Sequence, residues 1–146
     1  MSLSYWMIEG IGINVENVIP YVNKEKAARA ILEQHPDDDE LQEIILSGDY
    51  SSFDVEEYLY EVGFDNFADL LTHCDDTDSL TYSDDGDGNS YFYYPPSMPW
   101  HRVSNEPNSE EEVIDRIVTA VQKVTDMTRE NIVLKIDTEL YVVGIG

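Results

Sequence analysis

The chain has 146 residues, of which 31 are Asp or Glu and 8 are Lys or Arg, so its formal net charge is −23 and its isoelectric point is about 4.1. This length favours a single domain over residues 1–146, and a hydrophobic content of 42%, spread along the chain, excludes a wholly disordered acidic tail. The charge also disfavours direct binding to nucleic acid or to an anionic membrane.

The cellular compartment follows from cysteine usage and from the N-terminal residues. The one cysteine, Cys74, excludes an internal disulfide and suits a reducing compartment. The apolar N-terminal stretch has no Lys or Arg ahead of it and is interrupted by Glu9, which does not fit a signal peptide. No apolar run approaches the roughly 20 residues that span a bilayer. We therefore expect a cytoplasmic protein.

The first third of the chain predicts one strand followed by helices. β-Branched and aromatic residues indicate a strand over residues 5–13. Asn23 is placed to cap a helix over residues 24–35. An acidic run begins the next helix, over residues 37–47, where carboxylates lie at the positive end of the helix dipole, and Gly48 is its stop.

Residues 51–74 predict two short helices, which complete an acidic helical subregion over about residues 23–74. Asp54 is placed to cap the first of these helices and Asn66 the second, each with a Phe nearby that can pack onto its helix. Gly63 is placed to end the first helix.

The second half of the chain predicts two hairpins on either side of a long helix. Asp-Gly between two β-prone runs, residues 80–82 and 91–94, is a strong hairpin signal. An apolar stripe predicts the helix over residues 110–127, and alternation predicts a closing hairpin from residues 132–136 and 140–145. This order favours an α+β domain, with a mostly antiparallel sheet of about five strands packed with the long C-terminal helix and a cluster of short helices.

The acidic residues are concentrated in the middle of the chain. Residues 1–34 carry four acids and three bases (net −1), residues 102–146 carry nine acids and five bases (net −4), and residues 35–101 carry eighteen acids and no Lys or Arg (net −18). A net charge of about 2–8 in magnitude suffices for solubility, and the self-repulsion of a larger charge destabilises the compact state. This excess suggests a cationic partner; the alternative is a solvated acidic surface without one.

Carboxylates spaced along a helix can imitate the phosphates that a basic groove binds. Four acids, beginning at Glu57, lie four residues apart, which would place one carboxylate about every 6 Å on a helix face unless Gly63 bends the line. A basic site gains affinity for such a surface by releasing counterions. We therefore expect an interaction protein, not an enzyme, that binds and occludes a basic protein such as a nuclease or another nucleic-acid-binding protein. The residues expected to contact it are Asp37, Asp38, Asp39, Glu40, Glu57, Glu61, Asp65, Asp69, Asp75, Asp76, Asp78 and Trp100.

In size and acidity the chain is similar to the small inhibitors that phages and mobile elements direct against restriction or CRISPR nucleases. The resemblance is one of charge and length, and no motif allows individual residues to be carried over. It implies nucleic-acid mimicry, of an anti-restriction or anti-CRISPR kind, as the function to expect.

A second hypothesis concerns the loop that contains Asp85, Asp87 and Asn89. Oxygen-bearing side chains two residues apart are the pattern by which loops gather Ca²⁺. However, Ser90 stands where such a loop has its sixth-position glycine, and Pro96 where it has a bidentate Glu. Tight-turn chemistry is the alternative explanation, and with it we expect no cofactor.

A third hypothesis is a small-molecule pocket between helices and sheet, lined by Trp6, Tyr82 or Trp100. No catalytic motif accompanies it. His73 and Cys74 are adjacent in sequence and do not face the same way on a helix, and the acids that follow would raise the pKa of a thiol. We expect Cys74 to be a buried residue at a helix end.

Overall fold

The computed structural model describes residues 4–95, 107 and 109–146, and it combines one antiparallel sheet with helices. The expected α+β class is therefore confirmed. Within the described residues the sheet has four strands rather than about five, which are β1 (Tyr5–Asn14), β2 (Thr81–Asp84), β3 (Ser90–Tyr94) and β4 (Ile136–Ile145).

The strands are ordered β2-β3-β1-β4, so β2 and β4 form the edges of the sheet. Strands β2 and β3 form the hairpin predicted around the Asp-Gly loop, and β1 pairs with β4 over almost its whole length. The register between β1 and β4 shifts between Gly10 and Gly12. Gly10 has a φ of +139°, and a Cβ there would lie 1.9 Å from the carbonyl oxygen of Tyr94, so the close approach of β3 requires glycine.

Six α-helices occur in the described residues: α1 (Lys24–Gln34), α2 (Asp39–Ser47), α3 (Val55–Glu61), α4 (Phe67–Cys74), α5 (Glu110–Gln122) and α6 (Arg129–Lys135). Short 3-10 turns at Val15–Asn17 and Ile19–Tyr21 connect β1 to α1. Each α-helix begins after a polar side chain that accepts a hydrogen bond from a first-turn N–H group. These caps are Asn23, Asp38, Asp54, Asn66, Ser109 and Thr128.

The predicted closing hairpin is wrong in its first half, because residues 129–135 form α6 and β4 pairs with β1 instead. Thr128 caps α6 and accepts a hydrogen bond from the N–H of Asn131. Of the apolar residues 132–134 in α6, only Ile132 is buried, whereas Leu134 is 83% exposed. A short capped helix that buries one side chain is therefore favoured here over the strand that the β-propensity of Ile132 and Val133 predicts.

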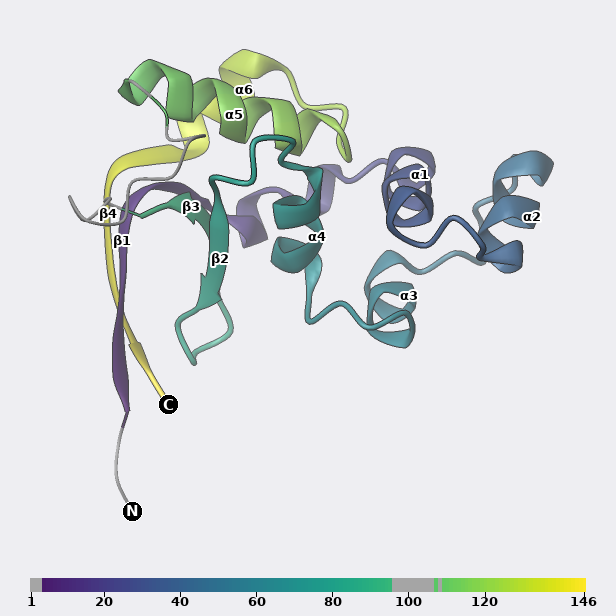
Figure 1. The fold of residues 1–146 in the computed structure, drawn as a ribbon, viewed down its shortest axis with the longest axis horizontal. Coiled ribbons are helices and arrows are strands. Elements are labelled where there is room, and N and C mark those ends of the chain that lie inside the picture. Colours follow the sequence, from purple (N-terminus) through teal and green to yellow (C-terminus); the bar gives the residue numbers. More distant parts are fainter. Residues whose placement is uncertain (1–3, 96–106, 108) are drawn as a thin grey trace.

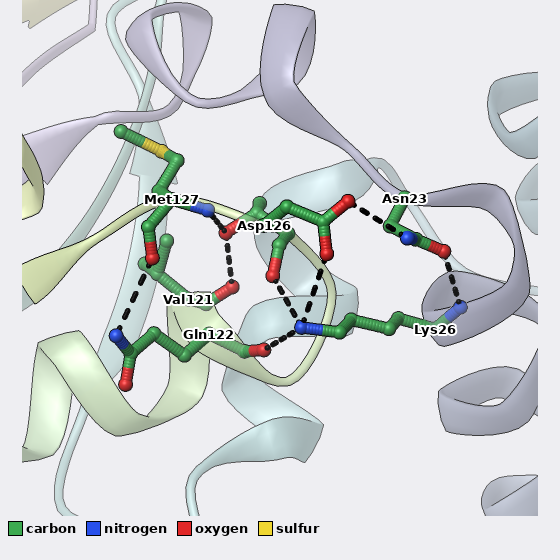
Figure 2. A network of polar contacts seen from close by, with 7 residues as sticks. Asn23, Lys26, Val121, Gln122, Asp126 and Met127 are labelled. Carbon is green, nitrogen blue, oxygen red and sulfur yellow. Dashed lines mark hydrogen bonds and ion pairs between the residues drawn. The ribbon is translucent and has the colours of Figure 1, made fainter.

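Helix α5 ends at Gln122, earlier than predicted, and Lys26 of α1 binds its free end (Figure 2). The Lys26 ammonium donates to the carbonyl oxygens of Gln122 at 3.3 Å and Thr125 at 2.8 Å, and lies 3.4 Å from the Asp126 carboxylate. Asp126 also accepts a hydrogen bond from the Asn23 side chain at 2.8 Å. Carbonyl groups at a helix C-terminus lack partners within the helix, and a cation is favourable there. This network joins the acidic helical subregion to the rest of the molecule.

The helices fall into two groups (Figure 1). Helices α4 and α5 pack on the sheet, and α6 packs on α5. Helices α1 and α3 pack on α4 and on each other, and α2 packs on α1. Helices α2 and α3 lie at the opposite end of the molecule from β1 and β4 (Figure 1). Within the described residues, none of the helices combines the length and the apolar character that crossing a membrane requires.

Within the described residues the core consists of two clusters, and the larger one contains residues from both groups of helices. Ile13 and Phe92 of the sheet join the buried side chains of α1, α4 and α5 in one cluster. Ile8, Tyr93 and Leu140 form a second, smaller cluster. Because successive side chains of a strand point to opposite faces, the two clusters lie on opposite faces of the sheet.

Candidate functional site

A small groove between α2 and α3 carries a concentration of carboxylates, and we call it the acidic groove. It has a volume of about 140 Å³. Four acids from α2, α3 and the cap of α3 line it, together with Ser52 and the apolar or aromatic residues Ile44, Phe53 and Tyr58. The four acids are Glu40, Asp54, Glu57 and Glu61.

Helix capping places acidic residues at the start of α2 and of α3. Asp38 accepts a hydrogen bond from a first-turn N–H group of α2 at 3.0 Å, and Asp54 does the same for α3 at 3.0 Å. Glu40 and Glu57 therefore lie in first turns, where the helix dipole favours negative charge. Glu61 follows Glu57 by four residues, which places both carboxylates on one side of α3.

A hydrogen bond from Tyr58 to Asp38 joins the two helices beneath these acids. The Tyr58 hydroxyl donates to the Asp38 carboxylate at 2.5 Å. Burial opposes ionisation of Asp38, but the bonds from Tyr58 and from two backbone N–H groups outweigh it, so the pKa of Asp38 lies below its usual value. Burial and the same bond raise the pKa of Tyr58, and the charges of Glu40 and Glu61 add to the effect. Carboxylates at the start of α2 and at the end of α3 therefore both raise the pKa of the Tyr58 hydroxyl.

The acids of the groove form no ion pair in the described part of the chain. The ion pairs found there involve acids elsewhere, namely Glu25, Asp69, Asp76, Glu112, Asp115 and Asp126. Lys24 lines a neighbouring cavity with Asp54 and Glu57, but its ammonium donates to the carbonyl oxygen of Tyr50 at 3.2 Å. Glu40, Glu57 and Glu61 are all exposed. The groove therefore presents to solvent carboxylates that have no ion-pair partner in the described residues.

The predicted ladder of acids four residues apart is broken at Gly63, whose φ is +99°. Its first two members lie on α3, whereas Asp65 precedes α4 and Asp69 lies in its first turn. Asp65 accepts a hydrogen bond from the Tyr82 hydroxyl at 2.5 Å, and Asp69 accepts one from the N–H of Asp65 at 3.0 Å. These two acids therefore hold the start of α4 in place.

Two of the three acids after α4, Asp75 and Asp76, also have partners inside the protein. Asp75 is 8% exposed, and its carboxylate accepts hydrogen bonds from three backbone N–H groups and one hydroxyl of the following loop. Asp76 pairs with Lys123 of the segment after α5 at 2.8 Å. Asp78 is exposed with a φ of 52°.

The remaining predicted contact residues lie near α2 or outside the described residues. Asp37 and Asp39 are exposed at the start of α2. Trp100 lies outside the described residues. Of the predicted acids, the structure thus brings Glu40, Glu57 and Glu61 into the lining of one groove, whereas Asp37, Asp38 and Asp39 lie beside it at the start of α2 and the others do not line it.

Sequence reasoning missed two exposed apolar side chains on the same helices. Leu46 of α2 is 87% exposed and Tyr60 of α3 is 82% exposed. A signal was present for Tyr60, because the adjacent Tyr58 and Leu59 already fill the inward positions of a short helix. Asp54 was expected only as a cap, and the structure also places it in the groove.

The loop predicted to bind Ca²⁺ is closed by its own hydrogen bonds. Asp85 accepts bonds from the N–H groups of Asp87 and Asn89 and from the Asn89 side chain, at 2.8–3.1 Å. Burial opposes ionisation of Asp85, but these bonds outweigh it and lower its pKa. Within the described residues, no three or more His, Cys, Asp or Glu side chains are grouped so as to hold a metal. The calcium site stays a prediction, and the loop is explained as a tight turn.

The residues predicted to line a small-molecule pocket have other contacts. The Trp6 indole donates to the carbonyl oxygen of Asp84 at 2.8 Å, and Tyr82 binds Asp65. A cavity of about 580 Å³ lies elsewhere, beside α1 and α3. Cys74 is buried at the end of α4 as expected, and burial raises the pKa of its thiol to about 12.

Comparison of the chain with protein-family models, with curated proteins and with solved structures finds no match. The interpretation of the site therefore depends on its geometry.

Proposed function

We propose that the chain is an interaction protein whose acidic groove, together with the exposed start of α2, binds a basic protein partner and occludes the partner's binding site. One observation supports this most. Glu40, Asp54, Glu57 and Glu61 converge from two helices on one groove and make no ion pair within the described residues.

Such an arrangement of acids costs stability in the free protein. Like charges four residues apart, as in Glu57 and Glu61, destabilise a helix by a few tenths of a kcal/mol. A net charge of −23 adds long-range repulsion. A cationic surface relieves both costs on binding, and long-range attraction accelerates the encounter.

The class of partner follows from the same chemistry. Proteins that bind nucleic acid carry Lys and Arg in grooves that neutralise phosphates and release counterions. An acidic groove on a small protein is complementary to such a surface and competes with nucleic acid for it. Tyr60 and Leu46 offer exposed side chains on the same two helices, and aromatic residues often contribute much of the binding energy at interfaces.

The test begins with affinity capture on the immobilised chain, followed by purification of the captured proteins. Each is then bound to fluorescently labelled duplex DNA, and displacement of the DNA by the chain is measured. The groove variant is Glu40→Gln/Glu57→Gln/Glu61→Gln. The matched control, Glu110→Gln/Glu111→Gln/Glu130→Gln, removes the same charge from exposed first-turn residues of α5 and α6.

We expect the wild-type chain and the control to displace the DNA about equally, and the groove variant to be at least about tenfold weaker. Displacement should weaken as salt rises. Captured proteins that are not basic, binding that is indifferent to salt, or equal weakening by both variants would each contradict the proposal.

A further inference from the structure

A cavity of about 580 Å³ lies beside the start of α3 and adjoins the acidic groove. The two share Ser52, Phe53, Asp54 and Glu57 in their linings. The cavity also has walls from the segment before α1, from the start of α1 and from the first residue of α4. Ligand sites typically have volumes of about 300–1,000 Å³, so this cavity, which we call the α3 cavity, is large enough to hold a long side chain.

Apolar side chains from separate segments of the chain line much of the α3 cavity. Phe53 and Phe67 are buried, whereas Ile19, Val22 and Val55 are partly buried. The carbon stem of a Lys or Arg side chain gains by contact with an apolar surface while its charged end stays among polar groups. This part of the lining therefore suits the stem of a long cationic side chain.

Three carboxylates and one ammonium complete the charged part of the lining, which gives it a net charge of −2. The carboxylates belong to Asp54, Glu56 and Glu57, which are exposed and form no ion pair within the described residues. The ammonium belongs to Lys24 and donates to the carbonyl oxygen of Tyr50 at 3.2 Å. The α3 cavity is therefore complementary to a cation that has an apolar body.

A guanidinium fits this combination of groups better than an ammonium does. It is planar, donates two parallel hydrogen bonds to a carboxylate and stacks on aromatic rings, which Phe53 and Phe67 provide. It is also more weakly hydrated than an ammonium, so it loses less on entering a partly apolar cavity. Arginine is accordingly enriched at protein interfaces, whereas lysine is depleted there.

We propose that the α3 cavity receives an arginine side chain of the basic partner, with the guanidinium paired to carboxylates of the lining and the carbon stem on its apolar residues. This inference rests on the proposed function, because the arginine belongs to the partner that the acidic groove binds. It adds a specificity that the groove does not supply. Attraction to positive charge alone does not distinguish arginine from lysine, whereas the α3 cavity does.

Two residues separate the α3 cavity from the acidic groove in an experiment, because they line the cavity and not the groove. Val55→Phe fills the cavity without changing its charge, and Glu56→Gln removes one carboxylate. Their matched controls on α6 are Val133→Phe, at an exposed valine, and Glu130→Gln, at an exposed first-turn acid. Lys24→Met removes the cation of the lining. Circular dichroism verifies that each variant folds.

The test is a titration of the full chain with three small probes, followed through the backbone amide NMR shifts of residues 51–57. The probes are the N-acetyl amides of arginine, of lysine and of citrulline, which has the shape of arginine without its charge. Because the titration needs no partner protein, its result does not depend on the DNA displacement that tests the acidic groove.

We expect the arginine amide to bind with a dissociation constant of about 1–10 mM, the lysine amide at least about threefold more weakly, and the citrulline amide not at all. Glu56→Gln should weaken binding about threefold, Val55→Phe at least about tenfold, and Lys24→Met should strengthen it about threefold. Val133→Phe and Glu130→Gln should match the wild type. A captured basic partner should bind Val55→Phe at least about threefold more weakly than Val133→Phe.

No binding of the arginine amide up to about 100 mM, or equal binding of the lysine or citrulline amide, overturns the proposal. A captured partner that binds Val55→Phe as tightly as Val133→Phe also overturns it. If Val55→Phe does not fold, Glu56→Gln and Lys24→Met decide, since they change the charge of the lining in opposite directions. If the groove variant fails to displace DNA and the arginine amide does not bind, this inference alone fails, whereas captured proteins that are not basic contradict the proposed function itself.

Discussion

The carboxylates of the acidic groove and those of the loop between α4 and β2 come from similarly acidic stretches of the chain but differ in what they contact. In the loop, Asp75 accepts four hydrogen bonds and Asp76 pairs with Lys123. In the groove, the exposed Glu40, Glu57 and Glu61 form no ion pair within the described residues. Carboxylates that stabilise the fold and exposed carboxylates without an ion pair in the described residues are therefore distinguished by their contacts and not by composition.

The largest expected effect is at Asp75. Asp75→Ala leaves three backbone N–H groups and a hydroxyl without their acceptor in a partly buried loop, and should lower the free energy of unfolding by about 3 kcal/mol. Urea denaturation at neutral pH measures it. A loss no larger than that of an exposed acid would show that the loop acids do not differ from those of the groove.

Tyr58→Phe removes the hydrogen bond that joins α2 to α3 and should lower the free energy of unfolding by about 1–2 kcal/mol. Tyr60→Phe is the control, because Tyr60 is 82% exposed and should change nothing. Denaturation of both variants at neutral pH gives the comparison, and equal effects would mean that the bond does not join the helices.

The contribution of Asp38 should depend on pH. Its pKa is lowered in the folded protein, so its stabilising effect is complete above its ordinary value of about 4 and is lost as pH falls through the lowered value. The difference between wild type and Tyr58→Phe should therefore shrink in acid. A difference that is constant down to about pH 2 would contradict the assignment.

Lys26→Met tests the network that fixes the helical subregion to the end of α5 (Figure 2). We expect a loss of about 1 kcal/mol, chiefly from the two carbonyl hydrogen bonds, because the Asp126 side chain is 67% exposed. Arg29→Met is the control, since its pair with Glu25 is exposed and should contribute only a few tenths of a kcal/mol. Thermal unfolding of both variants at one salt concentration measures the difference.

Neutralising the groove should have the smallest effect on stability. Glu40→Gln/Glu57→Gln/Glu61→Gln relieves like-charge repulsion but also removes two first-turn charges that the helix dipoles favour, so it should change the free energy of unfolding by no more than about 0.5 kcal/mol. Glu110→Gln/Glu111→Gln/Glu130→Gln removes only first-turn charges and should lose more stability than the groove variant. A groove variant that loses as much stability as Asp75→Ala would remove the distinction between the two regions.

Local chemistry allowed much of the fold to be predicted from the sequence. The caps Asn23, Asp54 and Asn66 and the breaker Gly63 act through neighbouring residues, and each lies where expected. Helix α6 was missed because its apolar residues favour a strand, although Thr128 was available as a cap.

The candidate site was less predictable because its contacts are distant in sequence. Asp38 and Tyr58 are twenty residues apart, and nothing local indicates that α2 packs beside α3. The burial of Asp75 was missed for a different reason. The segment resembles an acidic linker, although Thr77 and Ser79, which follow it, provide nearby hydrogen-bond donors.

The most direct test of the account is the affinity of a captured basic partner for three forms of the chain: wild type, the groove variant and its matched control. We expect the control to retain wild-type affinity and the groove variant to lose at least about tenfold, and we expect this loss to shrink as salt rises. Equal affinity of the groove variant and the control would contradict it, since total charge rather than the acidic groove would then govern binding.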